Sequence, residues 1–305
     1  MPTLAAVTQP ALDAVRARAP EGVELVAVED GVDLHSVDFL VPPVGDGAAP
    51  VLEALPGLER VSVVQLLSAG ADRFEEAMPP QATLCTARGA RDGPVAEWVI
   101  GALLGASSGL LRCARDRTWE RYRVEDLTSW KVLIVGMGSI GRLVGAHLEE
   151  LGAEVVGVAS RARDGLHGID ELQVLLPAAD AVVLLTPLTD STRGLIGIAE
   201  LAAMHDEAVL VNAARGPVVD TEALVREAGR GRLRAVLDVT DPEPLPEDHR
   251  LWTAPGVLAI TPHVAGDSRL AAMRSAQLAG DQLARWCAGE GLLNVVVAGS
   301  KPART

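Results

Sequence analysis

The stretch K-V-L-I-V-G-M-G-S-I-G, residues 131–141, decides the fold of this chain. Its apolar run from Val132 to Val135 is too short for a helix, so it predicts a buried strand. Gly136, Gly138 and Gly141 then follow the spacing G-x-G-x-x-G. At such spacing the first glycine allows a tight turn, the second lets a pyrophosphate approach the backbone, and the third lets a helix pack against the strand. The stretch therefore predicts a dinucleotide-binding site.

The residues that follow support this prediction over the alternative, a chance match in a glycine-rich chain. Apolar residues recur at helical spacing from Ile140 to Leu151, Gly152 predicts the end of the helix, and residues 154–158 predict another strand. The order strand, turn, helix, strand places Ser139 and Ile140 at a helix N-terminus, which faces the phosphates of a bound dinucleotide.

Composition and charge exclude several classes of function. The chain has 305 residues, 49% of them hydrophobic, which suggests about two domains. With a net charge of -14 and no long basic cluster, neither nucleic acid nor a membrane is an expected partner. Cys85, Cys113 and Cys287 match neither a metal site nor a disulfide framework, so we interpret them as small core residues and expect no metal.

We find no targeting signal in the sequence. The N-terminus M-P-T-L-A-A-V lacks a basic region, and no apolar run approaches the length of a membrane span. We expect a cytoplasmic protein and, because the sequence stops at Thr305, no added regulatory domain.

Short apolar runs alternate with helical patterns along most of the chain, which is typical of parallel α/β sheets. Five runs lie before residue 95 and six after it, at residues 4–7, 23–28, 37–41, 61–67, 82–86, 132–135, 155–159, 181–186, 208–213, 233–239 and 257–261. A last helix near 268–287 and a packed segment at 292–297 could return the chain to the first domain. We therefore expect two doubly wound domains. Residues 1–95 plus 272–305 form a flavodoxin-like substrate domain, and residues 96–271 form an inserted Rossmann domain.

The segment that begins at Pro94 predicts one long helix, apolar nearly all round, running to about Arg115. Such a helix must be covered on more than one side. We therefore expect a homodimer with this helix near the contact. The charged segment 112–126, which carries Trp119 and Tyr122, is interpreted as a surface excursion or a dimer arm.

Three charged residues follow predicted strands of the second domain. Arg215 comes after the strand that ends near Ala213, Glu243 after the strand that ends near Val239, and His263 after the strand that ends at Thr261. Ligands of open parallel sheets bind outside the carboxyl ends of the strands, so these three should converge. The other histidines fall in positions away from that edge: His35, His147, His167, His205 and His249.

This trio suits hydride transfer to a 2-keto acid. Arg215 would bind the substrate carboxylate with two hydrogen bonds and polarise the neighbouring carbonyl. His263 would donate a proton to the carbonyl oxygen, and Glu243 would orient the imidazole and keep its acid form populated. The alternative is a surface ion pair beside a helix-capping histidine.

The motifs resemble the D-isomer-specific 2-hydroxyacid dehydrogenases, the family of glyoxylate and hydroxypyruvate reductases, D-lactate dehydrogenases and 3-phosphoglycerate dehydrogenases. They occur in the family's order and span about residues 60–280: V-A-E (95–97), G-M-G-S-I-G (136–141), T-P-L-T-D-S-T-R-G-L-I-G (186–197), V-N-A-A-R-G-P-V-V-D (211–220), L-D-V-T-D-P-E-P-L-P (237–246) and T-P-H-V-A-G (261–266).

The resemblance implies roles for further residues. It gives Arg215, Glu243 and His263 the catalytic positions and lets Asp238 contact the nicotinamide carboxamide. It implies that the loop 67–71 receives the substrate carboxylate, and that family members are usually homodimers through the nucleotide domain. The implied cofactor contacts also include Thr186, Pro187, Ala213 and His263, and the implied substrate contacts are Ser68, Ala69, Gly70, Arg215 and His263.

The second nucleotide strand departs from the pattern of NAD enzymes, which end it in an acidic residue that binds the ribose hydroxyls. Here that position is Ala159, followed by Ser160, Arg161 and Arg163, which could bind a 2'-phosphate. We predict NADP(H) in preference to NAD(H), which stays possible. The alternative is that these arginines only solvate a loop, with Asp164 partly neutralising them.

Other departures bear on the substrate. Leu66 stands where phosphoglycerate enzymes place an arginine, and residues 1–95 contain no lysine, so a phosphorylated substrate is disfavoured. Glu243 argues against formate, because formate dehydrogenases have Gln beside the histidine. Thr240 stands where the family often has Phe. We predict a reductase of glyoxylate, hydroxypyruvate or a related small 2-keto acid. The alternative is a nicotinamide-sensing protein with little turnover, as in the C-terminal-binding corepressors.

Overall fold

The computed structural model describes residues 3–300, and the chain forms two compact units. The first unit comprises the residues up to Arg91 and those from Asp267 onward, and the second comprises Asp92–Gly266. These boundaries lie a few residues from the expected ones at 95/96 and 271/272. Residues 1–2 and 301–305, which the expected substrate domain includes, lie outside the described residues.

The first unit contains a six-stranded sheet in the order β13-β5-β4-β3-β1-β2. The first five strands are parallel, and their order is that of flavodoxin-like folds. The edge strand β13 pairs antiparallel with β5, so the predicted packed segment near the C-terminus is one more strand. The strands are β1 (Thr3–Val7), β2 (Val23–Ala27), β3 (Phe39–Val41), β4 (Val63–Gln65), β5 (Thr83–Cys85) and β13 (Val295–Val297).

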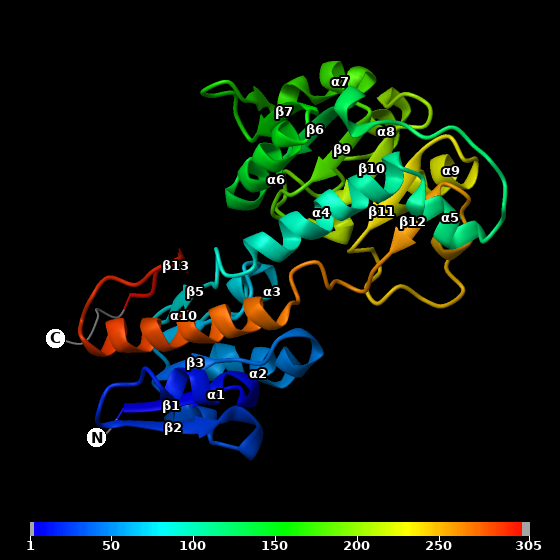
Figure 1. Ribbon diagram of the computed structural model, residues 1–305. Coiled ribbons are helices and arrows are strands. Elements are labelled where there is room, and N and C mark those ends of the chain that lie inside the picture. The colour runs from blue at the N-terminus through cyan, green and yellow to red at the C-terminus, as the bar shows by residue number, and fades with distance from the viewer. Residues whose placement is uncertain (1–2, 301–305) are drawn as a thin grey trace. The chain divides into compact units, whose positions relative to one another are not determined.

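Alternate residues of these strands pack into two apolar layers. On one face, Val7, Phe39 and Val63 pack with residues of α1 (Gln9–Arg16) and α10 (Arg269–Cys287). On the other face, Leu40 and Val64 pack with α2 (Ala49–Ala54) and α3 (Asp72–Glu75). Figure 1 shows α10 running along the sheet beside α1. The C-terminal helix thus completes a core that the N-terminal strands begin.

The second unit contains a seven-stranded sheet in the order β12-β11-β10-β9-β6-β7-β8, with every pair parallel. The chain reverses direction across the sheet between β6 and β9, which is the switch point of Rossmann folds. The six predicted strands are present, and β8 is a short seventh strand that the sequence did not indicate. The bounds are β6 (Lys131–Val135), β7 (Glu154–Ala159), β8 (His167–Gly168), β9 (Ala181–Leu184), β10 (Val209–Asn212), β11 (Arg234–Leu237) and β12 (Val257–Ile260).

Helices cover both faces of this sheet (Figure 1). Residues of α4 (Asp92–Ser107) and α6 (Ser139–Glu150) pack on one face against residues such as Ile134 and Val183. The opposite face packs with α7 (Leu172–Leu175), α8 (Ile198–Ala203) and α9 (Thr221–Gly229). Both units are therefore doubly wound, and the predicted fold class is confirmed.

The predicted single helix from Pro94 to Arg115 is wrong. The chain ends α4 at Ser107, passes through Gly109 in the left-handed region (φ 72°), and starts α5 (Leu110–Asp116) at a bend of 74°. The hydroxyl of Tyr122 donates to the carbonyl of Gly109 (2.6 Å), which holds the break. Among residues 3–300 no single helix is long and apolar enough to cross a membrane. The pair α4 and α5 reaches that length and apolar character only when the two helices are counted together, and half of the residues of α4 are buried within its unit.

The interpretation of the three cysteines is partly wrong. Cys85 is a buried core residue, and burial raises the pKa of its thiol to about 11. Cys113, however, is exposed on the surface of α5, and Cys287 is half-buried. Within the described ranges no cluster of three or more histidine, cysteine or acidic side chains could hold a metal ion.

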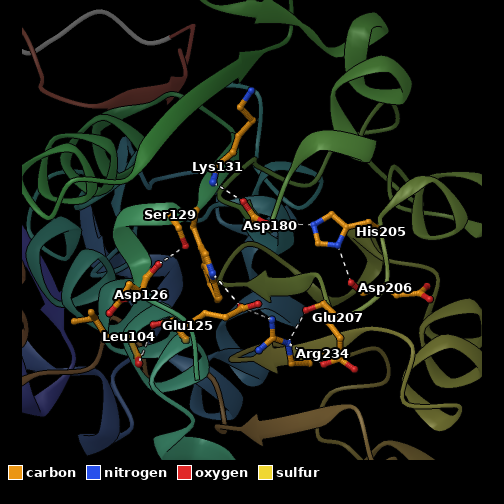
Figure 2. A network of polar contacts seen from close by, with 12 residues as sticks. Leu104, Glu125, Asp126, Ser129, Lys131, Asp180, His205, Asp206, Glu207 and Arg234 are labelled. Carbon is orange, nitrogen blue, oxygen red and sulfur yellow. Dashed lines mark hydrogen bonds and ion pairs between the residues drawn. The ribbon is translucent and has the colours of Figure 1, made fainter. Parts of the chain in front are cut away.

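Polar contacts pin the amino ends of the strands in the second unit (Figure 2). Asp180, just before β9, accepts a hydrogen bond from the backbone N–H of Lys131 (2.7 Å) and lies 3.4 Å from the ring of His205. Arg234, at the start of β11, lies 3.4 Å from the carboxylate of Glu125. This edge is opposite the one that carries the predicted catalytic residues.

Candidate active site

In the glycine turn between β6 and α6, other backbone atoms lie too close to Gly136 and Gly141 for a side chain, whereas the space beside Gly138 is open. Gly136 has φ 110°, and a Cβ there would lie 2.6 Å from the backbone of Leu185. A Cβ at Gly141 would lie 2.1 Å from the carbonyl oxygen of Gly136. At Gly138, by contrast, a Cβ would meet nothing within 4 Å. The turn therefore leaves room for a pyrophosphate beside the N-terminus of α6 and fits a dinucleotide.

The segment after β7 is a tight hairpin that displays basic side chains. The backbones of Arg163 and Leu166 exchange two hydrogen bonds (3.1 and 2.7 Å), and Asp164 takes a positive φ of 43° in the turn. Ser160, Arg161 and Arg163 are exposed, and neither arginine forms an ion pair with any described residue. Asp164 thus forms no ion pair with Arg161 or Arg163 that would neutralise their charge.

The base of the hairpin is fixed by Glu171. Its carboxylate accepts hydrogen bonds from the N–H of Gly168 (2.8 Å) and the ring of His167 (2.8 Å). These two bonds lower the pKa of Glu171. Because its oxygens are engaged there, Glu171 stays ionised and holds the chain at β8.

The three predicted catalytic residues lie on loops that leave one edge of the sheet. The strands β10, β11 and β12 are parallel neighbours, and Arg215, Glu243 and His263 follow their carboxyl ends. A Cβ at Gly216 would lie 1.9 Å from the carbonyl oxygen of Thr240, so the Arg215 loop and the Glu243 loop touch through their backbones. Only glycine permits this contact.

His263 and Glu243 form the central polar pair of this edge. The Nδ1 atom of His263 lies 2.6 Å from Oε1 of Glu243, and the two side chains are 47% and 42% exposed. His263 has a positive φ of 56°, which is unusual for a residue with a side chain. The bond at Nδ1 leaves Nε2 free to face a ligand.

Asp238, at the carboxyl end of β11, holds the turn that carries His263. One carboxylate oxygen accepts from the hydroxyl of Thr261 (2.6 Å) and the N–H of Val264 (2.9 Å), and the other accepts from the N–H of Ala265 (3.0 Å). The carbonyl of Asp238 also accepts from the N–H of His263 (2.8 Å). These bonds enclose His263 on both sides and offset the strain of its backbone.

The loop of Arg215 depends on Asn212, for which no role was predicted. Asn212 is buried at the end of β10, donates to the carbonyl of Arg215 (3.1 Å) and accepts from the N–H of Ala214 (3.0 Å). The guanidinium of Arg215 donates to the carbonyl of Ala214 (2.7 Å). The asparagine in V-N-A-A-R-G was a visible signal, since Asn side chains often bond to nearby backbone in turns.

The remaining predicted cofactor residues occupy the neighbouring strand ends. Thr186 and Pro187 follow β9, and the carbonyl of Pro187 accepts from the hydroxyl of Thr192 (2.7 Å), which stiffens that loop. Ala213 follows β10 and donates its N–H to the carbonyl of Leu184 (3.3 Å). These residues thus lie along the same edge as the glycine turn.

The predicted substrate loop belongs to the first unit, after β4. The hydroxyl of Ser68 donates to the carbonyl of Gly70 (2.8 Å), Ala69 is exposed at the tip, and Arg91 donates to the carbonyl of Leu67 (3.0 Å). The loop is a fixed turn, and its place beside Arg215 and His263 stays a prediction.

One of the other histidines differs from the expectation. His249 lines an open groove together with Asp241 and Pro242, so it lies near the turn that carries Glu243. Its ring accepts a hydrogen bond from the N–H of Leu251 (3.2 Å), which caps a short helical turn. His205 lies at the opposite, amino edge of the strands.

Comparison with known proteins identifies the family. Residues 102–265 match the family model of the D-isomer specific 2-hydroxyacid dehydrogenase, NAD binding domain. A glyoxylate reductase of Thermofilum pendens is 30% identical over 260 residues, which cover 79% of this chain and 76% of that protein.

Two solved structures resemble the whole chain. A D-isomer specific 2-hydroxyacid dehydrogenase from Xanthobacter autotrophicus, in complex with NADPH and MES, is 26% identical with a TM-score of 0.80, over 97% of this chain and 98% of that one. An NADPH-dependent glyoxylate/hydroxypyruvate reductase from Sinorhizobium meliloti, in complex with NADP and sulfate, is 26% identical with a TM-score of 0.79, also over 97% and 98%.

The fold and the family model together define a nicotinamide-dependent oxidoreductase. The chain belongs to the D-isomer specific 2-hydroxyacid dehydrogenase family.

Proposed function

We propose that this protein reduces a small, non-phosphorylated 2-keto acid to the D-2-hydroxy acid with NADPH, as a glyoxylate or hydroxypyruvate reductase does. The observation that carries the proposal is the contact between His263 and Glu243 (2.6 Å) on the sheet edge that also carries Arg215. Relatives named as glyoxylate reductase and glyoxylate/hydroxypyruvate reductase support this substrate class.

The roles of the three residues follow from their chemistry. Arg215 binds the substrate carboxylate and polarises the adjacent carbonyl, because a planar guanidinium matches a carboxylate with two parallel bonds. Glu243 holds Nδ1 of His263, so Nε2 donates a proton to the carbonyl oxygen and takes it back in the reverse direction. A dinucleotide held through its pyrophosphate at the glycine turn would supply the hydride.

The preference for NADP(H) rests on the hairpin after β7. Ala159 places no carboxylate where a 2'-phosphate would lie, and Arg161 and Arg163 extend into solvent without an ion pair among the described residues. Two cations free to bind a phosphate, with Ser160 as a hydroxyl donor, favour the phosphorylated cofactor. The NADPH bound in the related Xanthobacter autotrophicus structure and the NADP bound in that from Sinorhizobium meliloti support this choice.

We propose a homodimer that covers the exposed apolar residues around α4 and α5. Leu104 is 40% exposed, and Trp119, in the extended segment after α5, is fully exposed. Leu110 and Val124 add to the exposed apolar surface of the same region. We place the protein in the cytoplasm, since its free cysteines suit a reducing compartment.

The activity is tested by following the nicotinamide absorbance with NADPH and NADH separately, offering glyoxylate, hydroxypyruvate, pyruvate, phenylpyruvate and 2-ketoisocaproate. We expect NADPH to be consumed with glyoxylate or hydroxypyruvate.

His263→Ala should lower kcat/KM about 10²–10⁴-fold, the range of one acid–base group. Arg215→Lys should also lose activity, because an ammonium binds a carboxylate as a point charge. Full activity of His263→Ala would refute the assignment, and cofactor binding without any turnover would favour the sensor.

The cofactor preference is tested with the double variant Arg161→Ala and Arg163→Ala. We expect the KM for NADPH to rise about 100-fold or more, since the two lost bonds to a charged phosphate contribute about 1.5–3 kcal/mol each. The KM for NADH should stay within twofold. Arg226→Ala, which removes a cation from α9, is the matched control. An equal change for both cofactors would contradict the proposal.

A further inference from the structure

The turn that carries Glu243 receives little support from packing. Asp241, Pro242, Glu243 and Pro244 are all exposed. On its outer side the turn borders an open groove of about 580 Å³, lined also by Thr221 and His249. An exposed turn of this kind is free to move unless specific bonds hold it.

Two threonine hydroxyls supply such bonds at adjacent carbonyls. The hydroxyl of Thr240 donates to the carbonyl of Pro242 (2.9 Å), and the hydroxyl of Thr221 donates to the carbonyl of Asp241 (2.9 Å). These carbonyls belong to the two residues directly before Glu243. The turn is thus bonded from the start of its own loop and from a neighbouring helix.

Both threonines lie at positions whose backbone is fixed by other contacts. Thr240 is 8% exposed, and its carbonyl lies against Gly216, next to Arg215. Thr221 is the first residue of α9, whose N-cap Asp220 accepts the N–H of Ala223 (2.9 Å). The Glu243 turn is therefore held in place by the same part of the fold that holds the Arg215 loop.

We propose that Thr240 and Thr221 are positioning residues that hold the carboxylate of Glu243 at hydrogen-bonding distance from His263. The proposal rests on the proposed function for its kinetic consequence. Phe, which the family often has in place of Thr240, has no hydroxyl to donate. This chain thus fixes by a hydrogen bond what an aromatic side chain would have to fix by packing. A loosened Glu243 would leave the imidazole misoriented for proton transfer while the carboxylate site at Arg215 stays intact.

The kinetic test uses Thr240→Val and Thr221→Val, which keep the shape and remove the hydroxyl. We expect kcat to fall about tenfold or more in each, with KM for the keto acid within twofold, because the substrate carboxylate still binds to Arg215, which neither variant changes. Thr240→Ser and Thr221→Ser should restore kcat to within about threefold of the wild type, since they keep the donor. The matched control is Thr253→Val, whose hydroxyl bonds, within the described part of the chain, only to the carbonyl of Arg250 (3.4 Å).

A second arm asks whether the threonines act through Glu243. In a Glu243→Gln background, Thr240→Val should have little further effect, because residues that act as one unit are not additive. A full additional loss in that background would overturn the proposal, as would a wild-type kcat in both valine variants.

A third arm does not need turnover, so it separates this proposal from the proposed function. In a crystal structure of Thr240→Val, the separation of Nδ1 of His263 and Oε1 of Glu243 should exceed about 3.2 Å, the limit of a good hydrogen bond. An unchanged separation of 2.6 Å would overturn the positioning role even if no keto acid is a substrate.

Discussion

The carboxylate of Asp238 is almost fully buried, yet within residues 3–300 it forms no ion pair with a cation. Instead, Thr261, Val264 and Ala265 donate to it. The resemblance implied that Asp238 contacts the nicotinamide. Its bonds within the second unit also give it a structural role, because they hold the backbone of His263 in the left-handed region.

We predict that Asp238→Asn destabilises the protein by about 1–3 kcal/mol. The amide nitrogen of Asn cannot accept, so at least one buried N–H loses its partner. Asp220→Asn is the control, because Asn caps a helix about as well as Asp and should cost almost nothing. Denaturant unfolding of both variants measures the difference. Equal stability of the two would show that Asp238 does not hold the turn.

At this scale the sequence identifies the reacting groups but not their supports. Arg215, Glu243 and His263 could be chosen because each is a charged residue directly after a strand. Asn212 and Thr240 carry no charge, and their importance depends on which carbonyl lies within 3.1 Å of the side chain. That depends on the path of a loop, for which the sequence has no periodic signal.

At the scale of elements, the turn from β6 into α6 requires glycine for two different reasons, close packing of backbone and room for a ligand. At Gly141 the helix backbone approaches the strand so closely that any Cβ would overlap the carbonyl of Gly136. At Gly138 the space is open, so a side chain there would meet only a bound ligand.

We therefore predict opposite outcomes for two alanine variants. Gly138→Ala should fold with a melting temperature near that of the wild type and lose NADPH affinity, because the methyl group occupies the path of the pyrophosphate. Gly141→Ala should lower the melting temperature itself, since the helix must shift. Thermal unfolding with and without NADPH distinguishes them. Tight NADPH binding by Gly138→Ala would place the cofactor elsewhere.

The strands were predictable because apolar runs of buried parallel strands are continuous and bounded by turns. The break after α4 was not, since Ser107, Ser108 and Gly109 are compatible with an apolar helix in a sequence read alone. The hydroxyl of Ser108 bonds locally to the carbonyl of Leu104 (2.6 Å), as in the last turn of a helix, and the hydroxyl of Tyr122 holds the break through the carbonyl of Gly109. The contact of Tyr122 exists only once the segment after α5 has folded back.

For the whole molecule, the exposed face near the bend predicts self-association. Leu104→Arg should convert a particle of twice 31.8 kDa into one of 31.8 kDa in sedimentation equilibrium, because a buried guanidinium without a partner is costly at an interface. Val174→Arg is the control, since Val174 on α7 is 81% exposed but lies on the opposite face of the sheet. A wild type that sediments as a monomer would contradict the homodimer.

The first unit is made from both ends of the chain, and this determines when each part can mature during synthesis. The residues from Asp92 to Gly266 are contiguous, so the second unit has all its strands once they have left the ribosome. The first sheet lacks β13 and the cover of α10 until the residues after Gly266 are added, which leaves its apolar face open meanwhile. The strands β1 to β5 are thus covered only after the whole second unit has been translated, and synthesis that stops before α10 yields a complete nucleotide unit and an incomplete first unit.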